Sequence, residues 1–312
     1  MDLEIVIVSY NTKSLLAQCL ESVYAGLERA GLQGRIWVVD NASSDGSASM
    51  VRDHHPAVQL LALDRNLGFA AGNNAALQAC ASRGRSEARH ILFLNPDTLV
   101  QGDALGGLVR WLDATPDAGA AGARLVYRDG GFQHSAFRFA GLAQVFFDFF
   151  PVHHRLLESR LNGRYSRRAY EAGLPFEVDH PLGAALMVRS AVLRQVGSFD
   201  ERFFMYCEEV DLCRRIWAAG WRVFCVPGAL IVHLEGQSAK QFRDRMFVEL
   251  WRSRFLMYEK YESRAFRWAA RALVRLGLAA GGWRARKAFR RGAIGEAQLS
   301  GHLAAYREVA SL

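Results

Sequence analysis

Strand-like and helix-like segments alternate regularly over the first hundred residues, and this alternation constrains the fold more than any other feature. Glu4 to Ser9 is a nearly continuous β-branched run, as expected for a strand that is buried on both faces of a parallel sheet. Further strands are predicted over 35–40, 58–63 and 90–94, with helices over 13–26, 45–53 and 68–82. Repeated strand–helix units predict an α/β fold with a mostly parallel central sheet and flanking helices.

The alternation is lost beyond residue 100. Residues 120–182 mix short strands with an aromatic-rich stretch, and 181–211 predicts strand, helix, loop and helix. Two strand pieces are predicted around Pro227-Gly228, and the chain beyond Lys240 has a helical, basic pattern. We therefore predict an α/β domain over 1–240, a helical basic extension over 241–312, and no internal repeat.

The net charge of +8 is concentrated in this extension. From Lys240 onward the chain has 16 Lys/Arg and 6 Asp/Glu, whereas the preceding part has 23 and 25. A basic tail on a nearly neutral body favours an anionic surface as partner, such as lipid headgroups or nucleic acid, with plain solubility as the alternative. No recognisable nucleic-acid-binding module is present, so we expect no nucleic acid partner.

Cysteine usage and the N-terminal sequence indicate a cytoplasmic protein. The five cysteines are odd in number and never spaced C-x-x-C, which favours reduced thiols over a disulfide or zinc framework. The chain opens directly into an apolar strand without the basic region and cleavage site of a signal peptide. No uncharged apolar run approaches the 18 residues of a membrane span.

Polar residues follow three of the predicted strands, in the runs Ser9-Tyr10-Asn11, Asp40-Asn41 and Asn95-Pro96-Asp97. Ligands of such sheets bind at the carboxyl ends of the strands, so these residues predict a binding site. Asp40 is suited to accept hydrogen bonds from a nucleobase or a ribose, although Ser44 or Asp45 in the same loop is expected only to cap a helix.

Three residues at strand ends are candidates for binding a metal or the groups around it. Asp97 could hold a hard cation that neutralises a diphosphate leaving group, and Asn95 could contact the ribose or a metal-bound water. His233 ends an apolar strand and is a third candidate, as metal ligand or diphosphate contact, with an ordinary core or surface histidine as the alternative.

Carboxylates and aromatic side chains are combined in the segment 203–212. Aromatic neighbours desolvate a carboxylate and raise its pKa, which suits a general base for a sugar hydroxyl. Glu208 and Glu209 are the candidates, whereas Asp211 could simply stabilise the start of a helix.

These segments together resemble the family 2 glycosyltransferases of the GT-A fold, particularly the bacterial rhamnosyltransferase-like branch. The matching stretches occur in the family's order and cover about residues 3 to 240: 5–11, 38–47, 66–74, 93–98, 197–204, 208–212 and His233. The resemblance implies that the donor nucleotide meets Ser9, Asn11, Asp40, Asn66, Gly68, Asn73 and Asn95.

The resemblance also implies that Asn95-Pro96-Asp97 replaces the family's D-x-D metal motif, with Asn in place of the first Asp. It places Glu209 at the position of the base, which is more usually Asp after Glu. The extra methylene moves the carboxylate by about 1.5 Å, so Glu208 remains the competing assignment.

The function expected from these features is inverting sugar transfer from a dTDP- or UDP-sugar donor, with rhamnose among the expected sugars. Mg²⁺ or Mn²⁺ is the expected cofactor, and a cell-envelope glycan or lipid-linked intermediate is the expected acceptor. A non-catalytic nucleotide-sugar-binding protein of the same fold is the first alternative. A nucleotidyltransferase is the second, although its usual Gly- and Arg/Lys-rich first loop is replaced here by 9–13.

The basic extension is predicted to form an amphipathic helix that contacts an anionic membrane. Arg264, Arg267, Arg271 and Arg275 share one helical face in the sequence, and a second basic cluster follows at 284–291. The opposite face carries Phe266, Ala270, Leu273 and Gly277. The alternative is that this apolar face packs on the protein itself. The enzyme is thus expected to be cytoplasmic and peripheral on the inner face of the membrane.

Overall fold

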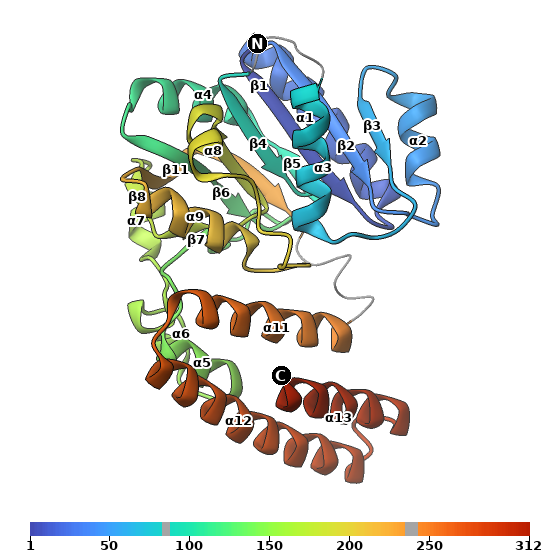
Figure 1. Ribbon diagram of the computed structural model, residues 1–312, viewed down its shortest axis with the longest axis vertical. Helices are drawn as coiled ribbons and strands as arrows, with labels where there is room; N and C mark the ends of the chain where they lie inside the picture. The colour runs from blue at the N-terminus through green and yellow to red at the C-terminus, as the bar shows by residue number, and fades with distance from the viewer. Residues whose placement is uncertain (83–87, 235–242) are drawn as a thin grey trace. The chain divides into compact units, whose positions relative to one another are not determined.

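A computed structural model describes residues 1–82, 88–234 and 243–312 (Figure 1). The chain forms two compact units. The first comprises 1–138, 165–204 and 208–238, and the second comprises 139–164, 205–207 and 239–312.

The first unit is built on a nine-stranded, mostly parallel sheet (Figure 1). The strand order along the sheet is β3 (Gln59–Ala62), β2 (Gly34–Asp40), β1 (Leu3–Ser9), β4 (His90–Leu94), β10 (Ala185–Arg189), β6 (Ala118–Val126), β11 (Arg222–His233) and β5 (Thr98–Val100), with β8 (Phe176–Glu177) paired to β11. Strands β1 to β4, β6 and β11 run in one direction, and β5, β8 and β10 run in the other. The predicted α/β fold class is confirmed. A second, two-stranded sheet pairs β7 (Ala136–Phe137) with β9 (His180–Pro181).

Helices cover both faces of the large sheet, which explains why β1 is apolar throughout. Ile5 and Ile7 belong to a core that includes α1 residues, whereas Val6 and Val8 belong to a core that includes α3, α8 and α9 residues. Alternate side chains of a strand point to opposite faces, so both faces of β1 must be apolar. The helices of this unit are α1 (Lys13–Ala30), α2 (Ser47–His54), α3 (Phe69–Ser82), α4 (Ala104–Ala114), α7 (Arg167–Glu171), α8 (Ser190–Val196) and α9 (Glu208–Ala218).

The segment 222–233 is one strand, whereas the sequence predicts two pieces. Strand β11 pairs with β6 on both sides of Pro227-Gly228, and the register shifts between Val226 and Leu230. Proline lacks the amide N–H that a sheet ladder needs, so a bulge absorbs it and the strand continues. This continuity brings His233 to the carboxyl edge of the sheet.

The second unit is helical and contains α5 (Leu142–Phe149), α6 (His154–Leu157), a 3₁₀ turn (Arg160–Asn162), α11 (Arg243–Tyr261), α12 (Arg264–Arg290) and α13 (Glu296–Ser311). Its core is aromatic: the rings of Phe149 and Trp251 stack with centroids 5.0 Å apart, and Phe149 packs where Gly277 leaves space on α12. The aromatic stretch 139–164, assigned by the sequence to the first domain, thus packs with the C-terminal helices. The expected boundary at 240/241 lies outside the described residues.

None of the described helices is both long enough and apolar enough to cross a membrane.

Candidate functional site

The predicted strand-end residues lie along one edge of the first unit's sheet. β1, β2, β4 and β11 run in the same direction, so Ser9, Asp40 and His233, which end three of these strands, and Asn95, which follows the fourth, share the carboxyl edge. This is the edge at which ligands of parallel sheets bind.

Asp40 presents a free acceptor at this edge. Its side chain is buried, with 2% of the residue exposed, and Oδ2 accepts a hydrogen bond from the backbone N–H of Ser43. The other carboxylate oxygen, Oδ1, is buried without a partner among the described residues. A buried acceptor is costly unless something donates to it, so Oδ1 is suited to receive an N–H or O–H from a bound molecule.

Ser9 and Asn11 shape the loop around Asp40. The Ser9 hydroxyl lies 2.8 Å from the Thr12 hydroxyl. Asn11 lies in the left-handed region at φ +53°. Its side-chain Oδ1 accepts from the Ser44 backbone N–H, and its own backbone N–H donates to the Ser43 hydroxyl oxygen. The Asn11 side chain thus joins the loop after β1 to the loop after β2, and the predicted contact of Ser9 and Asn11 with the donor nucleotide stays a prediction.

Asn41 connects this loop to the segment 66–69. Its amide donates to the Gly68 carbonyl and accepts from the Leu67 N–H, at 2.9 and 3.1 Å. Asn66 accepts from the Gly68 N–H in turn. Asn73 donates to the Phe69 carbonyl from α3, while its buried Oδ1 has no partner among the described residues.

Gly68 permits a close approach that a larger residue would block. It lies at φ +86°, and a Cβ added there would stand 2.2 Å from the Phe204 carbonyl oxygen. The same oxygen accepts a 2.7 Å hydrogen bond from the Phe69 N–H. This hydrogen bond joins the loop before α9 to segment 66–69, which is expected to bind the donor.

Asp97 and His233 face each other across the pairing of β5 with β11. Asp97 Oδ1 lies 3.6 Å from His233 Nε2, and both residues are only 6% exposed. The Leu234 N–H donates to the Asp97 carbonyl and fixes the two backbones together. A carboxylate oxygen and an imidazole nitrogen are both metal-binding groups, and the pair suits Mn²⁺ better than Mg²⁺, which prefers oxygen ligands.

Gln133 contacts the other nitrogen of the same imidazole. Its Nε2 is 3.2 Å from His233 Nδ1, and its buried Oε1 has no partner within the described part of the chain. Turning the amide by 180° would let Oε1 accept from Nδ1–H, in the tautomer whose Nε2 is unprotonated, as metal binding requires. In the described ranges no three His, Cys, Asp or Glu residues form a metal-binding cluster, so other ligands would have to complete a site.

Glu208 and Glu209 begin α9 and are both desolvated. Burial raises the pKa of the Glu208 carboxyl well above its ordinary value, and the charge of Glu209 raises it further. Burial also raises the pKa of Glu209, while backbone hydrogen bonds, including that of Gly183, act in the opposite direction. One carboxylate oxygen of each residue, Oε2, has no partner among the described residues. Both carboxyls are therefore available for proton transfer.

Only Glu209 is linked by described contacts to the strand-end residues. A Cβ on Gly183 would lie 3.3 Å from Glu209 Cγ, so the side chain rests on the backbone just before β10. The adjacent Ala184 carbonyl accepts a 2.9 Å hydrogen bond from the Asn95 N–H. The side chains of successive helix residues point about 100° apart around the axis, so the Glu208 side chain does not lie against Gly183.

Asp211 has a structural role. Its side chain is fully buried and pairs with Arg215 at 2.9 Å. Arg215 also donates to the carbonyls of Val196, Gly197 and Ser198, so the pair holds α9 to the end of α8. These contacts fit the stabilising role in the helix that the sequence leaves open as the alternative for Asp211.

Left-handed backbone directly precedes the two glutamates. Tyr206 and Cys207 have φ values of +69° and +67°, a conformation that costs non-glycine residues about 1–2 kcal/mol. Sequence patterns gave no signal for the left-handed backbone of these two residues, nor for Gln133 or Gly183, which act through partners distant in the chain.

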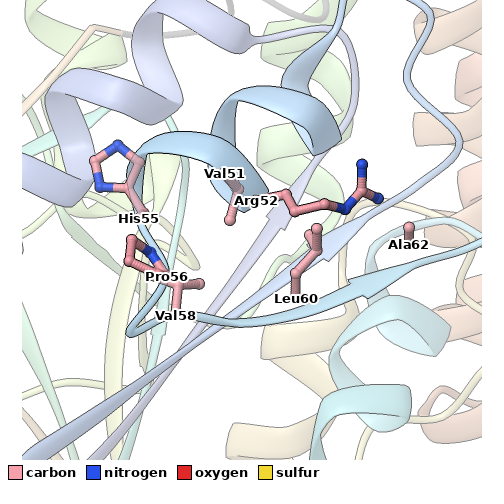
Figure 2. A pocket seen from close by; sticks show the side chains of 7 residues that line it. All are labelled: Val51, Arg52, His55, Pro56, Val58, Leu60 and Ala62. Atoms are coloured by element: carbon pink, nitrogen blue, oxygen red, sulfur yellow. The ribbon is translucent and has the colours of Figure 1, made fainter.

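A separate hollow of about 350 Å³ lies between α2 and β3 (Figure 2). It is lined by Val51, Arg52, His55, Pro56, Val58, Leu60 and Ala62. No predicted site residue is among them, so the hollow is not the site described above.

Comparison with known proteins shows the family of the chain. The family model described as glycosyl transferase family 2 matches residues 4–192. An N-acetylglucosaminyl-diphospho-decaprenol L-rhamnosyltransferase of Mycobacterium tuberculosis is 29% identical over 248 residues, which are 76% of this chain and 77% of that protein. The rhamnosyltransferase WbbL of Escherichia coli is 26% identical over 250 residues, 78% and 87% of the two chains.

A solved structure shares the fold. The mannosyltransferase PcManGT from Pyrobaculum calidifontis, in complex with GDP-Man and Mn²⁺, superposes with a TM-score of 0.55 at 18% identity, over 99% of this chain and 83% of that one. This likeness supports the GT-A fold predicted from the sequence. Because the family model spans more than half of the chain and the strand-end site lies largely within it, the chain belongs to glycosyl transferase family 2 and is a glycosyltransferase.

Proposed function

We propose that this enzyme is a metal-dependent, inverting rhamnosyltransferase that uses dTDP-rhamnose and a lipid-linked diphospho-sugar acceptor. The two rhamnosyltransferases similar to most of the chain support this donor sugar, and the decaprenol-linked substrate in one relative's name supports this acceptor class. The observation that carries the proposal is the shared sheet edge of Asp40, Asp97, His233 and, through Gly183 and Asn95, Glu209.

The donor half of the site is the surface around Asp40. Its unpartnered Oδ1 would accept the ring N–H of a thymine or uracil base. Segment 66–69 and Asn73, held by Asn41 and α3, would border the nucleotide. Asn95, half-buried beside Asp97, would reach the ribose or the diphosphate.

Asp97 and His233 would hold the divalent cation. When bound, such an ion neutralises the negative charge that develops on the departing nucleoside diphosphate. Gln133 would hold His233 in the tautomer whose Nε2 is unprotonated and can coordinate a metal.

Glu209 would act as the general base. It removes the proton from the acceptor hydroxyl as that oxygen attacks the anomeric carbon, and the bond from this carbon to the diphosphate oxygen breaks in the same step. A single displacement inverts the configuration at the anomeric carbon, through a transition state with oxocarbenium character. The raised pKa of Glu209 makes its carboxylate a stronger base than an exposed glutamate.

We further propose that the reaction takes place on the cytoplasmic face of the membrane, where a lipid-linked acceptor would be reached.

The test is a donor and acceptor panel with the purified full-length chain. dTDP-, UDP- and GDP-sugars are each combined with a polyprenyl-diphospho-N-acetylglucosamine acceptor and Mn²⁺ or Mg²⁺, and nucleoside diphosphate release is measured. We expect turnover with dTDP-rhamnose and an inverted anomeric configuration in the product by NMR. Turnover with another donor alone would contradict the rhamnose assignment, and retained configuration would contradict the single displacement.

A further inference from the structure

Helix α12 carries the densest positive charge in the described part of the chain. Its 27 residues include eight Lys or Arg and no Asp or Glu, and at about 1.5 Å per residue it is about 40 Å long. Two of these cations are used within the second unit. Arg271 lies over the Phe255 ring and donates to the Leu312 carbonyl, and Arg284 donates to the Phe149 carbonyl.

One face of α12 is buried within its own unit. Ala270, Val274, Gly277, Gly281 and Ala285 recur at helical spacing and are buried. Phe149 of α5 packs against Gly277, and Tyr306 of α13 packs against Gly281. The sequence predicts that the apolar face with Ala270 and Gly277 contacts a membrane, or alternatively packs on the protein itself. Both residues lie in this interface, so the face packs on the protein itself.

The opposite face of α12 exposes large apolar side chains. Trp268, Leu276 and Trp283 are 75%, 62% and 56% exposed. Trp268 and Trp283 are 15 residues apart, about four turns or about 22 Å along the axis, and Leu276 lies between them. Of the nine large apolar side chains exposed in the described residues, four lie on this one helix.

Basic side chains share this outer face with the tryptophans. Arg275, Arg286 and Arg290 follow Trp268 by 7, 18 and 22 residues, close to two, five and six turns, and all three are exposed. Lys287 Nζ lies 4.8 Å from the centre of the Trp283 ring. Among the described residues, no carboxylate forms an ion pair with a cation of α12.

We propose that this outer face of α12 is a docking surface for a membrane of anionic lipids. Tryptophan rings favour the level of the headgroups, and lysine and arginine bind the negative surface at about 1 kcal/mol per cation. The outer face of α12 carries a row of rings and cations and no acidic residue. It therefore complements the surface of an anionic membrane, which is negatively charged and partly apolar. The proposal does not depend on the donor or acceptor proposed above.

The experiment measures binding of the full chain to vesicles, without turnover. Sedimentation is compared between phosphatidylcholine vesicles and vesicles that contain about one quarter phosphatidylglycerol. We expect binding only to the anionic vesicles, weakened by raising the salt from 0.1 to 0.5 M because surface charges become screened.

Two sets of variants locate the surface. Replacing Arg275, Arg286 and Arg290 together by Gln should weaken vesicle binding about 100-fold, as three cations at about 1 kcal/mol each predict. The double variant Trp268→Ser, Trp283→Ser should weaken it at least 10-fold. Arg307→Gln on α13 and Leu174→Ser in the first unit remove an exposed cation and an exposed leucine elsewhere, and both should bind like the unaltered chain.

Circular dichroism and melting curves establish that each variant folds. Equal binding to neutral and anionic vesicles, or unaltered binding by both α12 variants, would overturn the proposal. Tighter binding of single-stranded RNA than of vesicles at the same salt would overturn it in favour of a nucleic acid partner.

Discussion

At the scale of single residues, the site combines groups that are buried and only partly satisfied. Oxygens of Asp40, Gln133, Glu208 and Glu209 are buried without a hydrogen-bond partner among the described residues. Each such atom costs folding free energy, and acceptors left without a donor are expected of a site that is completed by its ligands.

Asp97→Ala should abolish metal-dependent turnover while leaving the fold intact, because a carboxylate at a strand end is not part of the hydrophobic core. We expect Mn²⁺ affinity, measured by electron paramagnetic resonance with nucleoside diphosphate present, to fall by a factor of about 10–100 or more. Asp53→Ala, which removes an exposed carboxylate of α2, is the control. Retention of more than about a tenth of the activity would contradict the metal assignment.

Gln133→Met should weaken Mn²⁺ binding by a factor of about 10–100, because it removes the amide that, once turned, would accept from His233 Nδ1–H. Gln133→Glu keeps an acceptor at that position and should restore binding. Equal losses in the two variants, with unchanged melting temperatures, would show that Gln133 does not act through the imidazole.

Glu209→Gln should leave donor affinity nearly unchanged and lower kcat by about 10²–10⁴. Since burial raises the pKa of Glu209, kcat/KM of the unaltered enzyme should rise with pH through a pKa above the ordinary glutamate range. A large loss in Glu208→Gln instead would move the base by one residue.

The raised pKa of Glu208 has its own consequence for stability. A carboxyl whose pKa is higher in the folded state destabilises that state as pH rises from the unfolded pKa through the folded one. Glu208→Gln should therefore raise the melting temperature at pH 8 more than at pH 4, by a few degrees.

At the scale of elements, the site depends on how loops are fastened to each other. The Phe69 N–H donates to the Phe204 carbonyl, which lies against Gly68. Tyr206 and Cys207, both in the left-handed region, then lead the chain into α9. The position of Glu209 therefore depends on a contact made five residues earlier.

Gly68→Ala should lower both stability and kcat, because its Cβ would meet the Phe204 oxygen at 2.2 Å. We expect about 1–2 kcal/mol of loss from the left-handed backbone alone, and more from the displaced carbonyl. Gly220→Ala has the same φ of +86° with nothing within 4 Å of the added Cβ, so it isolates the backbone cost. Equal losses of stability and kcat in the two variants would show that the contact with Phe204 does not matter.

At the scale of the whole molecule, the second unit is assembled from distant parts of the chain. Phe149 of α5 stacks on Trp251 of α11 and fills the space at Gly277 of α12. Residues 139–164 are therefore expected to depend on the C-terminal helices for their burial.

Deletion of 264–312 should loosen α5 as well as remove two helices. Exposing Phe149 to water should lower the free energy of local unfolding of α5 by about 1.5–3 kcal/mol. Protease cleavage within 139–164 should therefore become about 10- to 100-fold faster. Gly277→Leu, which forces a side chain into the Phe149 ring, should act in the same direction, whereas Leu276→Ser on the exposed face should not. Unchanged cleavage of the deletion variant would show that α5 is stable alone.

The sequence by itself determined the elements whose side chains repeat with a local period. The apolar run of β1 and the polar residues after β1, β2 and β4 predict the sheet and its binding edge, because parallel strands bring their carboxyl ends together. Asp40 and Asp97 could be singled out for this reason, and the family resemblance pointed to the same residues.

Only the tertiary structure decided which distant groups meet. Gln133 reaches His233 across 100 residues, and Gly183 supports Glu209 from a different loop. Likewise, the outer face of α12 could be identified only from the structure, in which Phe149 covers small residues on the other face of this helix. A local pattern reports the period of a helix or strand, whereas partners such as these are set by side-chain packing between segments that are far apart in the chain.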